Sequence, residues 1–567
     1  MLSLAAFAAL GLISILTMTG CATVPYSSKA VTEARGACGE CHAAQVDAHA
    51  VGPHSQSACS TCHVGAAEHA ADPETATASI DWRVDSCARC HETIASMYLY
   101  DDNLKVGSFG GSQREPEIHK VETFPEYNTI VAGHPFTRDY REEGAKRYIL
   151  EDHYGTLRGK FDTCLQCKST RIAWAWDRGR ALTVAEDQTV TLKHTATDEK
   201  PARTVEVPAG TVVQLGTDFE SFEVSSTATF PDGRTFTSRP GPDEDPLEHY
   251  DMVWAAAMAA TKDVLPYGMG CNHCHDPHNA QPRILRSALK VAIERGGGEG
   301  QGGVNPYDPK AGTTFEDARV RDRDILRCAQ CHVEYTCARS GIDGKVRDHF
   351  GWSKAADIHD YYMDRFGYEQ DWLQPIIGAP LVKSQHPEVE LFWNSPHYNS
   401  GASCVSCHMP RVRTHAGEWV RSHWQTSPYK YHEPEVFAAF AEATGVQPAL
   451  ERGPCAVCHE DRTQRGLASQ TAVYERQKTV ERLLARSVGT LGEVREAVEA
   501  GVKVDAAAHS KAIEEHQRAH VLWENLIVSE NSMGFHNLPE VFSAMDAAEE
   551  HAREAIHQAQ AALPAGR

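Results

Sequence analysis

The sequence predicts a mainly α-helical protein with little regular sheet, long C-terminal helices and a small β insertion. Three observations support this fold class. Eight C-x-x-C pairs recur along the chain, and we expect short helices and loops around them. Apolar side chains recur at helical spacing near the C-terminus, and alternating β-branched residues are confined to about residues 183–240.

The composition excludes two broad classes of protein. The chain has 567 residues, of which 41% are hydrophobic, so it is too apolar for a disordered chain. It carries 55 basic against 77 acidic side chains, a net charge of −22. A nucleic-acid-binding protein needs a basic footprint, so this charge argues against nucleic acid as a partner.

The cysteine pattern is the most informative feature of the sequence. The eight pairs use 16 of the 18 cysteines and leave only Cys21 and Cys337. Seven pairs are followed directly by histidine: Cys38/Cys41/His42, Cys59/Cys62/His63, Cys87/Cys90/His91, Cys271/Cys274/His275, Cys328/Cys331/His332, Cys404/Cys407/His408 and Cys455/Cys458/His459. The eighth pair, Cys164/Cys167, is followed by Lys168.

C-x-x-C-H is the attachment motif of c-type haem. The two thiols form thioethers with the porphyrin, and the next residue binds the iron as an axial ligand. A zinc site would combine two pairs for each metal and leave the fixed histidine unexplained, and a disulfide scaffold explains it no better. The sequence therefore predicts eight c-type haems.

The N-terminus indicates export from the cytoplasm. Leu2 to Met18 form an apolar run that is short for a membrane span and resembles a secretory signal, which we place at residues 1–20. Met18-Thr19-Gly20-Cys21 resembles a bacterial lipobox and predicts a lipid anchor at Cys21; the alternative is an ordinary signal cut nearby. Either form gives a periplasmic or other extracytoplasmic protein.

Motif spacing predicts three regions after the signal. Residues 30–110 form an N-terminal three-haem domain, and residues 111–470 form a five-haem catalytic core that contains the β insertion. Residues 471–567 form a helical region in which Val480, Leu484, Val488 and Leu491 recur at helical spacing. This last region either packs onto the core or forms a dimer interface.

Lys168 marks the haem that differs from the others. Lysine must lose its proton to bind iron, and burial and the metal both promote that loss. An iron held by one protein ligand keeps its other face open to substrate. The alternative is a degenerate, unused motif.

Around this motif the chain resembles the ammonia-forming cytochrome c nitrite reductases, whose catalytic haem has a C-x-x-C-K motif. The resemblance covers about residues 120–180 and 245–560. The eight-haem count resembles the octahaem nitrite reductases specifically. The matching segments are "AGHPFTRDY" (132–140), "TLRG" (156–159), "CLQCKS" (164–169), "CAQCHVEY" (328–335), "KSQHPEVE" (383–390), "CVSCHMP" (404–410) and "MGFH" (533–536).

The resemblance implies roles for individual residues. Lys168 is the proximal ligand of the catalytic iron, and Arg158, Tyr335 and His386 lie on its distal side. A cationic arginine attracts an anion such as nitrite, and a histidine delivers protons near neutral pH. The resemblance also implies a calcium site formed by Glu334, Tyr335, Lys383 and Gln385.

Cys337 lies two residues after Tyr335, and the octahaem group has a Tyr–Cys thioether beside its catalytic haem. The resemblance therefore implies a Tyr335–Cys337 crosslink; the alternative is a free buried cysteine.

The chain has 30 histidines, so second ligands for the other irons are abundant. By family position the distal ligands include His397, His423 and His536, with His119 as a weaker candidate. For the N-terminal haems His49, His54, His69, His134, His153 and His278 compete, and the sequence does not choose among them.

The resemblance implies an oxidoreductase that reduces nitrite to ammonium by six electrons, with related nitrogen oxyanions or hydroxylamine, and more slowly sulfite, as further substrates. It also implies a homo-oligomer that receives electrons from a quinol-linked or soluble cytochrome donor. Three alternatives remain: an enzyme like hydroxylamine oxidoreductase, a tetrathionate reductase, and a non-catalytic electron conduit. Lys168 argues against the first of these, since that group has histidine at the catalytic motif.

Overall fold

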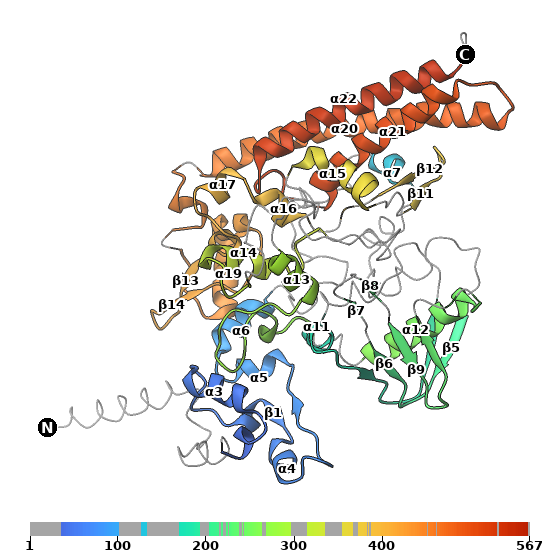
Figure 1. Ribbon diagram of the computed structural model, residues 1–567. Coiled ribbons are helices and arrows are strands. Elements are labelled where there is room, and N and C mark those ends of the chain that lie inside the picture. The colour runs from blue at the N-terminus through green and yellow to red at the C-terminus, as the bar shows by residue number, and fades with distance from the viewer. Residues whose placement is uncertain are drawn as a thin grey trace. The chain divides into compact units, whose positions relative to one another are not determined.

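The computed structural model describes residues 36–100, 126–132, 169–192, 203–214, 217–218, 223–224, 226–237, 241, 243–262, 268–295, 314–334, 354–366, 372–382, 384, 387–450, 452–460, 462–529 and 532–564. These residues form two compact units, and Figure 1 labels their elements. The first unit takes its described residues from Met1–Leu104, Met269–Arg283 and His408–Glu451. The second takes them from Lys105–Gly268, Ile284–Cys407 and Arg452–Arg567.

The first unit consists of short elements. Its helices are α3 (Ala43–Val51), η1 (Cys59–Thr61), α4 (Ala66–Ala71), α5 (Val84–Ala88), α6 (Glu92–Leu99), η6 (Cys271–His273), η10 (Pro428–His432) and α19 (Pro434–Thr444). Its strands form two antiparallel pairs, β1 (His63–Val64) with β2 (Ser79–Ile80) and β13 (Arg411–Arg413) with β14 (Trp419–Arg421).

An aromatic cluster forms the main side-chain core of this unit. Met97 of α6 is fully buried beside Trp424, Phe437 and Phe440. The rings of Trp424 and Phe440 are stacked, with centroids 4.1 Å apart and an interplanar angle of 7°. This cluster joins α6 to α19, whereas α3 and α4 bury no side chain at all.

The β insertion lies in the second unit, and the sequence predicted it. An antiparallel sheet has the strand order β10 (Thr235–Thr237), β9 (Thr227–Thr229), β6 (Val212–Gln214) and β3 (Leu182–Thr183). Beside it β4 (Gln188–Leu192) pairs with β5 (Arg203–Val207), and β7 (Thr217–Asp218) pairs with β8 (Glu223–Val224). Helix α12 (Pro246–Thr261) covers the apolar face, where Trp254 is fully buried among the inward-facing valines.

The second unit also contains many short elements, two of which, α14 (Val320–Cys328) and η11 (Cys455–Val457), include haem-motif cysteines. The remaining short elements are α7 (Tyr127–Ile130), α11 (Thr170–Asp177), α13 (Ser287–Arg295), η8 (Ala355–Asp357), α15 (Ile358–Asp360), the π-helix η9 (Tyr361–Phe366), β11 (Trp372–Gln374), β12 (Ala379–Leu381), α16 (Glu388–Phe392) and α17 (Pro396–Asn399). Helix α18 (Cys404–His408) contains the seventh motif.

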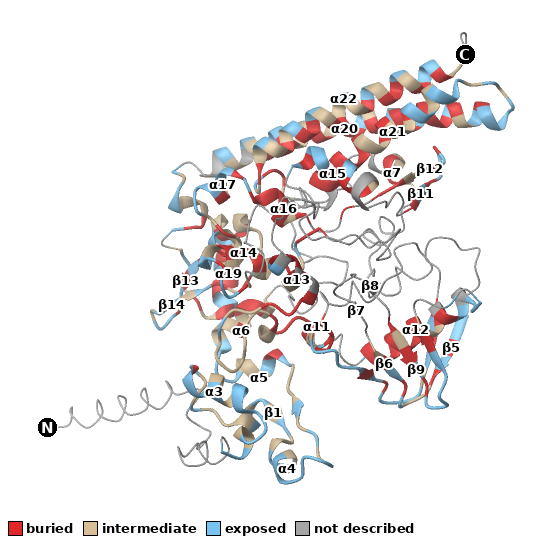
Figure 2. Ribbon diagram, in the orientation of Figure 1, coloured by how far each residue is buried: buried red, intermediate tan, exposed pale blue. Residues whose placement is uncertain are grey.

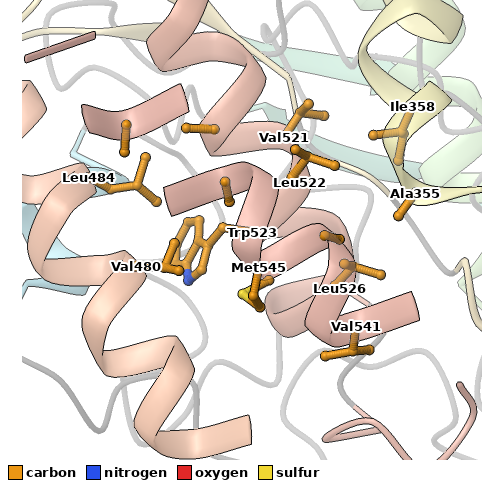
Figure 3. Close-up of a cluster of buried hydrophobic side chains, with 14 of the residues drawn as sticks. Ala355, Ile358, Val480, Leu484, Val521, Leu522, Trp523, Leu526, Val541 and Met545 are labelled. Carbon is orange, nitrogen blue, oxygen red and sulfur yellow. The ribbon is translucent and has the colours of Figure 1, made fainter. Parts of the chain in front are cut away.

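Three long C-terminal helices lie side by side, drawn in orange and red in Figure 1. They are α20 (Arg462–Glu499), α21 (Ala506–Trp523), which continues as the π-helix η12 (Glu524–Ser529), and α22 (Leu538–Ala562). The four apolar residues predicted from helical spacing, Val480, Leu484, Val488 and Leu491, are all fully buried. In Figure 3, Val480 and Leu484 lie close to Trp523. The mainly α fold with long C-terminal helices is therefore confirmed.

No helix in the described ranges is both long enough and apolar enough to span a lipid bilayer.

Candidate haem-binding and catalytic sites

The described C-x-x-C-H motifs are built on tight turns of backbone. In five of them the histidine N–H donates to the carbonyl oxygen of the first cysteine at 2.8–3.1 Å, as in His42 to Cys38 and His275 to Cys271. This is a helical i→i−4 bond, which holds the two cysteines and the histidine in one compact turn. The remaining three bonds of this kind join His91 to Cys87, His332 to Cys328 and His459 to Cys455.

The same turns position the second cysteine of each motif. In six motifs its N–H donates to the carbonyl oxygen of the first cysteine at 3.1–3.3 Å; these second cysteines are Cys41, Cys62, Cys90, Cys274, Cys331 and Cys458. The first cysteines are half-buried, as are Cys274 and Cys331, whereas Cys41, Cys90 and Cys458 are exposed.

No two of the described cysteines are joined by a disulfide. The sequence predicted that both cysteines of every motif bind haem. For the second cysteines Cys41, Cys62, Cys90, Cys274, Cys331 and Cys458 the structure shows the turn that places each beside its motif histidine. Their attachment to haem stays a prediction, and it rests on the motif.

Five motif histidines each lie opposite a second histidine that belongs to no motif. The ring centroids are 6.3 Å apart for His42 and His69, 6.3 Å for His63 and His278, 6.0 Å for His91 and His54, 6.4 Å for His275 and His423, and 6.2 Å for His459 and His397. Three of these pairs involve the N-terminal motifs, for which the sequence left the second histidine open.

The spacing of these pairs fits a metal between the rings. A metal–imidazole bond is about 2 Å long, and the ring centre lies about 1 Å further on. Two imidazoles on opposite faces of one haem iron thus have centroids about 6 Å apart. The donor set and its spacing therefore suit haem iron.

Hydrogen bonds from Nδ1 of the histidine rings leave Nε2 available to bind iron. A ligating histidine uses one ring nitrogen for the metal and donates the other N–H to a neighbouring oxygen. The Nδ1 atoms of His69, His54, His275, His408, His423 and His397 donate to backbone carbonyls at 2.8–3.3 Å. Each Nε2 then remains for metal binding.

Burial also favours the neutral form of these rings. It lowers the pKa of His63 and of His91, and nearby histidines lower both further. Burial lowers the pKa of His397 as well. A neutral imidazole has the lone pair that iron requires.

Close backbone approach fixes part of the N-terminal arrangement. His54 donates from Nδ1 to the carbonyl of Pro277 at 2.8 Å. A Cβ added at Gly52 would collide with the carbonyl oxygen of His278 and would lie 2.8 Å from the Cα of Asn279. Only glycine allows the 52–54 and 277–279 segments to lie this close, and this contact helps position His54 and His278.

Cysteines of different motifs also meet. The Cys87 thiol donates a hydrogen bond to Cys271, which raises the pKa of Cys87 and lowers that of Cys271. In the second unit a hydrogen bond from Cys404 lowers the pKa of Cys328 to about 7. Groups bound to adjoining motifs would therefore lie close together.

Further contacts extend both series of motifs. In the first unit the Cys38 and Cys59 thiols are joined by a hydrogen bond. Burial, and then the nearby Cys87, raises the pKa of Cys62. In the second unit burial raises the pKa of Cys407 to about 11, and Cys455 contributes to the rise. The motifs are thus adjacent in the order 38–59–87–271 within one unit and 328–404–455 within the other.

The residues of the predicted catalytic haem lie outside the described residues. These are Arg158, Cys164, Cys167, Lys168, Tyr335, Lys383, Gln385 and His386, together with Cys21, His119, His134, His153 and Cys337. Their described neighbours are buried. Ser169 and Ser384 are fully buried, and the N–H of Ser384 donates to the Glu524 carboxylate at 2.8 Å.

Glu334, the one described residue of the predicted calcium site, lies in a buried acidic environment. Its Oε1 accepts a 2.6 Å hydrogen bond from the Tyr362 hydroxyl, and its backbone N–H donates to Glu390 at 2.9 Å. Burial first, and then the neighbouring Glu334, raises the pKa of Glu390. Two buried carboxylates so close together suit a hard cation, although no group of three or more His, Cys, Asp or Glu side chains suited to a metal occurs within the described residues.

Sequence reasoning did not identify His54, His69 and His278 as partners of particular motifs. No local pattern marks them, because each lies opposite a motif from another part of the chain. His49, which competed with them, lies in α3 and is in none of the five pairs above. His536 lies beside Phe392, with ring centroids 6.0 Å apart, and its role as a distal ligand stays a prediction.

Comparisons with known proteins agree with the motif geometry. The Cytochrome c552 family matches residues 240–566, more than half of the chain. The cytochrome c nitrite reductase subunit NrfA of Nitratidesulfovibrio vulgaris (strain Hildenborough) is 28% identical over 341 residues, which are 56% of this chain and 58% of that relative. The chain thus spans little more than half the length of this curated relative.

One solved structure is also similar. Cytochrome c nitrite reductase from Desulfovibrio desulfuricans ATCC 27774, described with two calcium sites in its catalytic subunit, is 24% identical with a TM-score of 0.41. The match covers 53% of this chain and 58% of that one. On the family match, the chain belongs to the cytochrome c552 family and is a c-type cytochrome.

Proposed function

We propose that this protein is an octahaem cytochrome that reduces nitrite to ammonium by six electrons at a haem bound by Lys168. The observation that carries the proposal is the single lysine among eight haem motifs, seven of which end in histidine. Seven irons with two histidine ligands would carry electrons. One iron with a lysine ligand would keep a face for substrate.

The residues around Lys168 suit reduction of a small anion. Arg158 would attract and orient nitrite by its charge, and His386 would deliver protons near neutral pH. Tyr335 would donate a hydrogen bond to the reacting group. A haem held by Lys168 would supply the redox chemistry, and the external donor would supply the electrons. Hydroxylamine would be a further substrate and sulfite a slower one.

The histidine pairs support axial ligands for five of the seven proposed electron-carrying haems. The assignments are His42 with His69, His63 with His278, His91 with His54, His275 with His423, and His459 with His397. For the haems at His332 and His408 we retain His536 and His119 as candidate ligands from the family resemblance.

Motif contacts support electron transfer along each unit. The adjoining cysteine pairs give two runs of neighbouring haems, one through Cys38, Cys59, Cys87 and Cys271 and one through Cys328, Cys404 and Cys455. The three N-terminal haems would then receive electrons from a quinol-linked or soluble donor. A reservoir of eight haems exceeds the six electrons of one turnover, so a reduced enzyme can complete the reaction.

Several structural parts of the proposal accompany this activity. Calcium would bind Glu334, Tyr335, Lys383 and Gln385 and hold the tyrosine segment rigid. A Tyr335–Cys337 thioether would fix the phenol ring. The protein would act outside the cytoplasm as a homo-oligomer, with a lipid anchor at Cys21.

The test is steady-state nitrite reduction with a viologen donor and quantified ammonium. Wild-type protein should form one ammonium for each nitrite. Lys168→His should lose roughly a hundredfold or more of the rate, because a histidine-bound iron changes the catalytic haem, and His386→Ala should lose about a hundredfold. Lys354→His, a change of the same kind at an exposed lysine, should keep full activity.

Outcomes that contradict the proposal are equally clear. Oxidation of hydroxylamine without nitrite reduction would support the oxidoreductase alternative, and turnover of tetrathionate alone would support the sulfur alternative. A protein that transfers electrons but changes none of these substrates would be a conduit.

A further inference from the structure

The carboxylates of Glu388 and Glu390 bind residues 332–334, at the end of the Cys328/Cys331/His332 motif. Residues 388–390 make three contacts with residues 332–334, and we name them the 388–390 clamp. The Glu388 carboxylate accepts from His332 Nδ1 at 3.1 Å, and the Val389 N–H donates to the His332 carbonyl at 3.2 Å. The Glu390 carboxylate accepts the Glu334 N–H at 2.9 Å.

The glutamate side of the clamp is largely buried, whereas the His332 side chain is 53% exposed. Val389 and Glu390 are buried in α16, and the Glu388 side chain is 16% exposed. Because the backbone on both sides is hydrogen-bonded, the Glu388 carboxylate is held against the imidazole. A hydrogen bond to an ionised carboxylate is stronger than one to a neutral oxygen.

His332 differs in this respect from His397, a predicted haem ligand of the same unit. His397 donates from Nδ1 to the backbone carbonyl of Phe535 at 3.1 Å. A carboxylate draws the Nδ1 proton away from the ring more strongly than a neutral carbonyl does. The ring then becomes a stronger electron donor to a bound metal and favours its oxidised form.

The first unit contains a second example. His278 donates from Nδ1 to Asp276 at 3.0 Å, whereas His54, His69 and His423 donate to backbone carbonyls. Among the predicted haem ligands, each unit thus contains a carboxylate-bonded histidine and at least one carbonyl-bonded histidine for comparison.

We propose that Glu388 is a redox-tuning residue that lowers the midpoint potential of the haem at His332. In the tuned step one electron reaches the iron, and the proton stays on Nδ1 between the imidazole and the carboxylate. The haem assignment, and the link to catalysis, rest on the proposed function.

A low potential at this position would aid turnover. A haem that is hard to reduce gives up its electron readily, which favours onward transfer over storage. Glu390 supports this arrangement as a positioning residue, because it holds the backbone of Glu334 in place.

The test is Glu388→Gln in the full haem-loaded protein, followed by potentiometric titration with optical and electron paramagnetic resonance detection. Glutamine keeps a hydrogen-bond acceptor but removes the charge, so the ring orientation is retained. One low-spin haem should become about tenfold easier to reduce, which equals about 59 mV for a one-electron couple. The other haems should titrate as in wild type.

Two further variants sharpen the result. Glu388→Asp restores the charge and should recover much of the wild-type potential. Asp276→Asn should shift a different haem, the one at His63, and leave the Glu388-sensitive signal unchanged. The double variant Glu388→Gln/Asp276→Asn should show both shifts in midpoint potential, since the effects of distant sites add.

The contrary results are distinct from those for the proposed function. Unchanged potentials in Glu388→Gln, or equal shifts in every haem, would overturn the tuning proposal whatever the protein reduces. A single shifted haem in a protein that forms no ammonium would keep the tuning proposal and refute nitrite reduction.

Discussion

The N-terminal residues 36–100 and the C-terminal helices α20, α21 and α22 differ in how many of their side chains are buried. In the helices apolar side chains such as Leu484 and Trp523 are fully buried, and red dominates their inner faces in Figure 2. In residues 36–100 the helices α3 and α4 bury no side chain, and these segments are tan and pale blue in Figure 2. The helices therefore carry their own core, whereas residues 36–80, which include the first two motifs, bury no side chain, and we expect haem to supply their core.

Loss of a haem should separate the two regions most strongly. Cys59→Ser with Cys62→Ser would remove the attachment of one predicted N-terminal haem, and residues 36–80 should lose nearly all protection against hydrogen exchange. Cofactor binding supplies folding free energy where a side-chain core is small. Peptides from α20 to α22 should keep wild-type protection, and equal loss in both regions would refute the comparison.

A large cavity should instead destabilise the helices. Trp523 is fully buried, and its Nε1 donates to Glu481 at 3.0 Å. Trp523→Ala should lower the unfolding free energy of the helices by about 3–5 kcal/mol, measured by hydrogen exchange of their peptides. Val51→Ala, at a side chain 88% exposed, is the matched change in the N-terminal region and should cost less than about 0.5 kcal/mol.

Glu481 gives the helices a pH dependence. Burial raises its pKa to about 7 from the ordinary 4.5, so the folded state holds a proton that the unfolded state releases. Its contribution to stability is full below pH 4.5, falls as the pH rises to about 7 and is flat above. Across this range the loss is of the order of 3 kcal/mol.

His516 opposes this effect and makes the test specific. Burial lowers its pKa to about 4 from 6.5, so its contribution falls as the pH decreases through that range. Glu481→Gln removes the pH dependence due to Glu481 and leaves that due to His516. The unfolding free energy of the helices should then rise steadily between pH 4 and 6.5. Hydrogen exchange at several pH values measures this slope, and a wild-type profile in the variant would contradict the assignment.

The smallest expected effect concerns the start of α21. The Asp505 carboxylate accepts from the N–H groups of Ala507 and Ala508 at 2.9 and 3.2 Å. Asp505→Ala should cost about 1 kcal/mol by loss of this cap, read from exchange in the first turn of α21. Asp505→Asn keeps a capping oxygen and should cost much less; equal costs would exclude the cap as the cause.

The sequence predicted what is encoded in contiguous residues. The C-x-x-C-H motifs, the helical spacing of Val480 and Leu484 and the alternation within the β insertion each lie in one short segment. The pairing of His63 with His278 could not be predicted, because the two residues are distant in the chain and no local pattern accompanies the second histidine. The buried Glu481 and His516 were also missed, since helical periodicity places residues on a face without requiring that each be apolar.

The central claim is that one iron of eight is open and lysine-bound while the others have two histidine ligands. Electron paramagnetic resonance with magnetic circular dichroism on the fully oxidised protein counts low-spin and high-spin haems directly. We expect seven low-spin haems and one high-spin haem, with nitrite changing only the high-spin signal and Lys168→His altering that same signal. Eight low-spin haems that do not respond to nitrite would contradict the account.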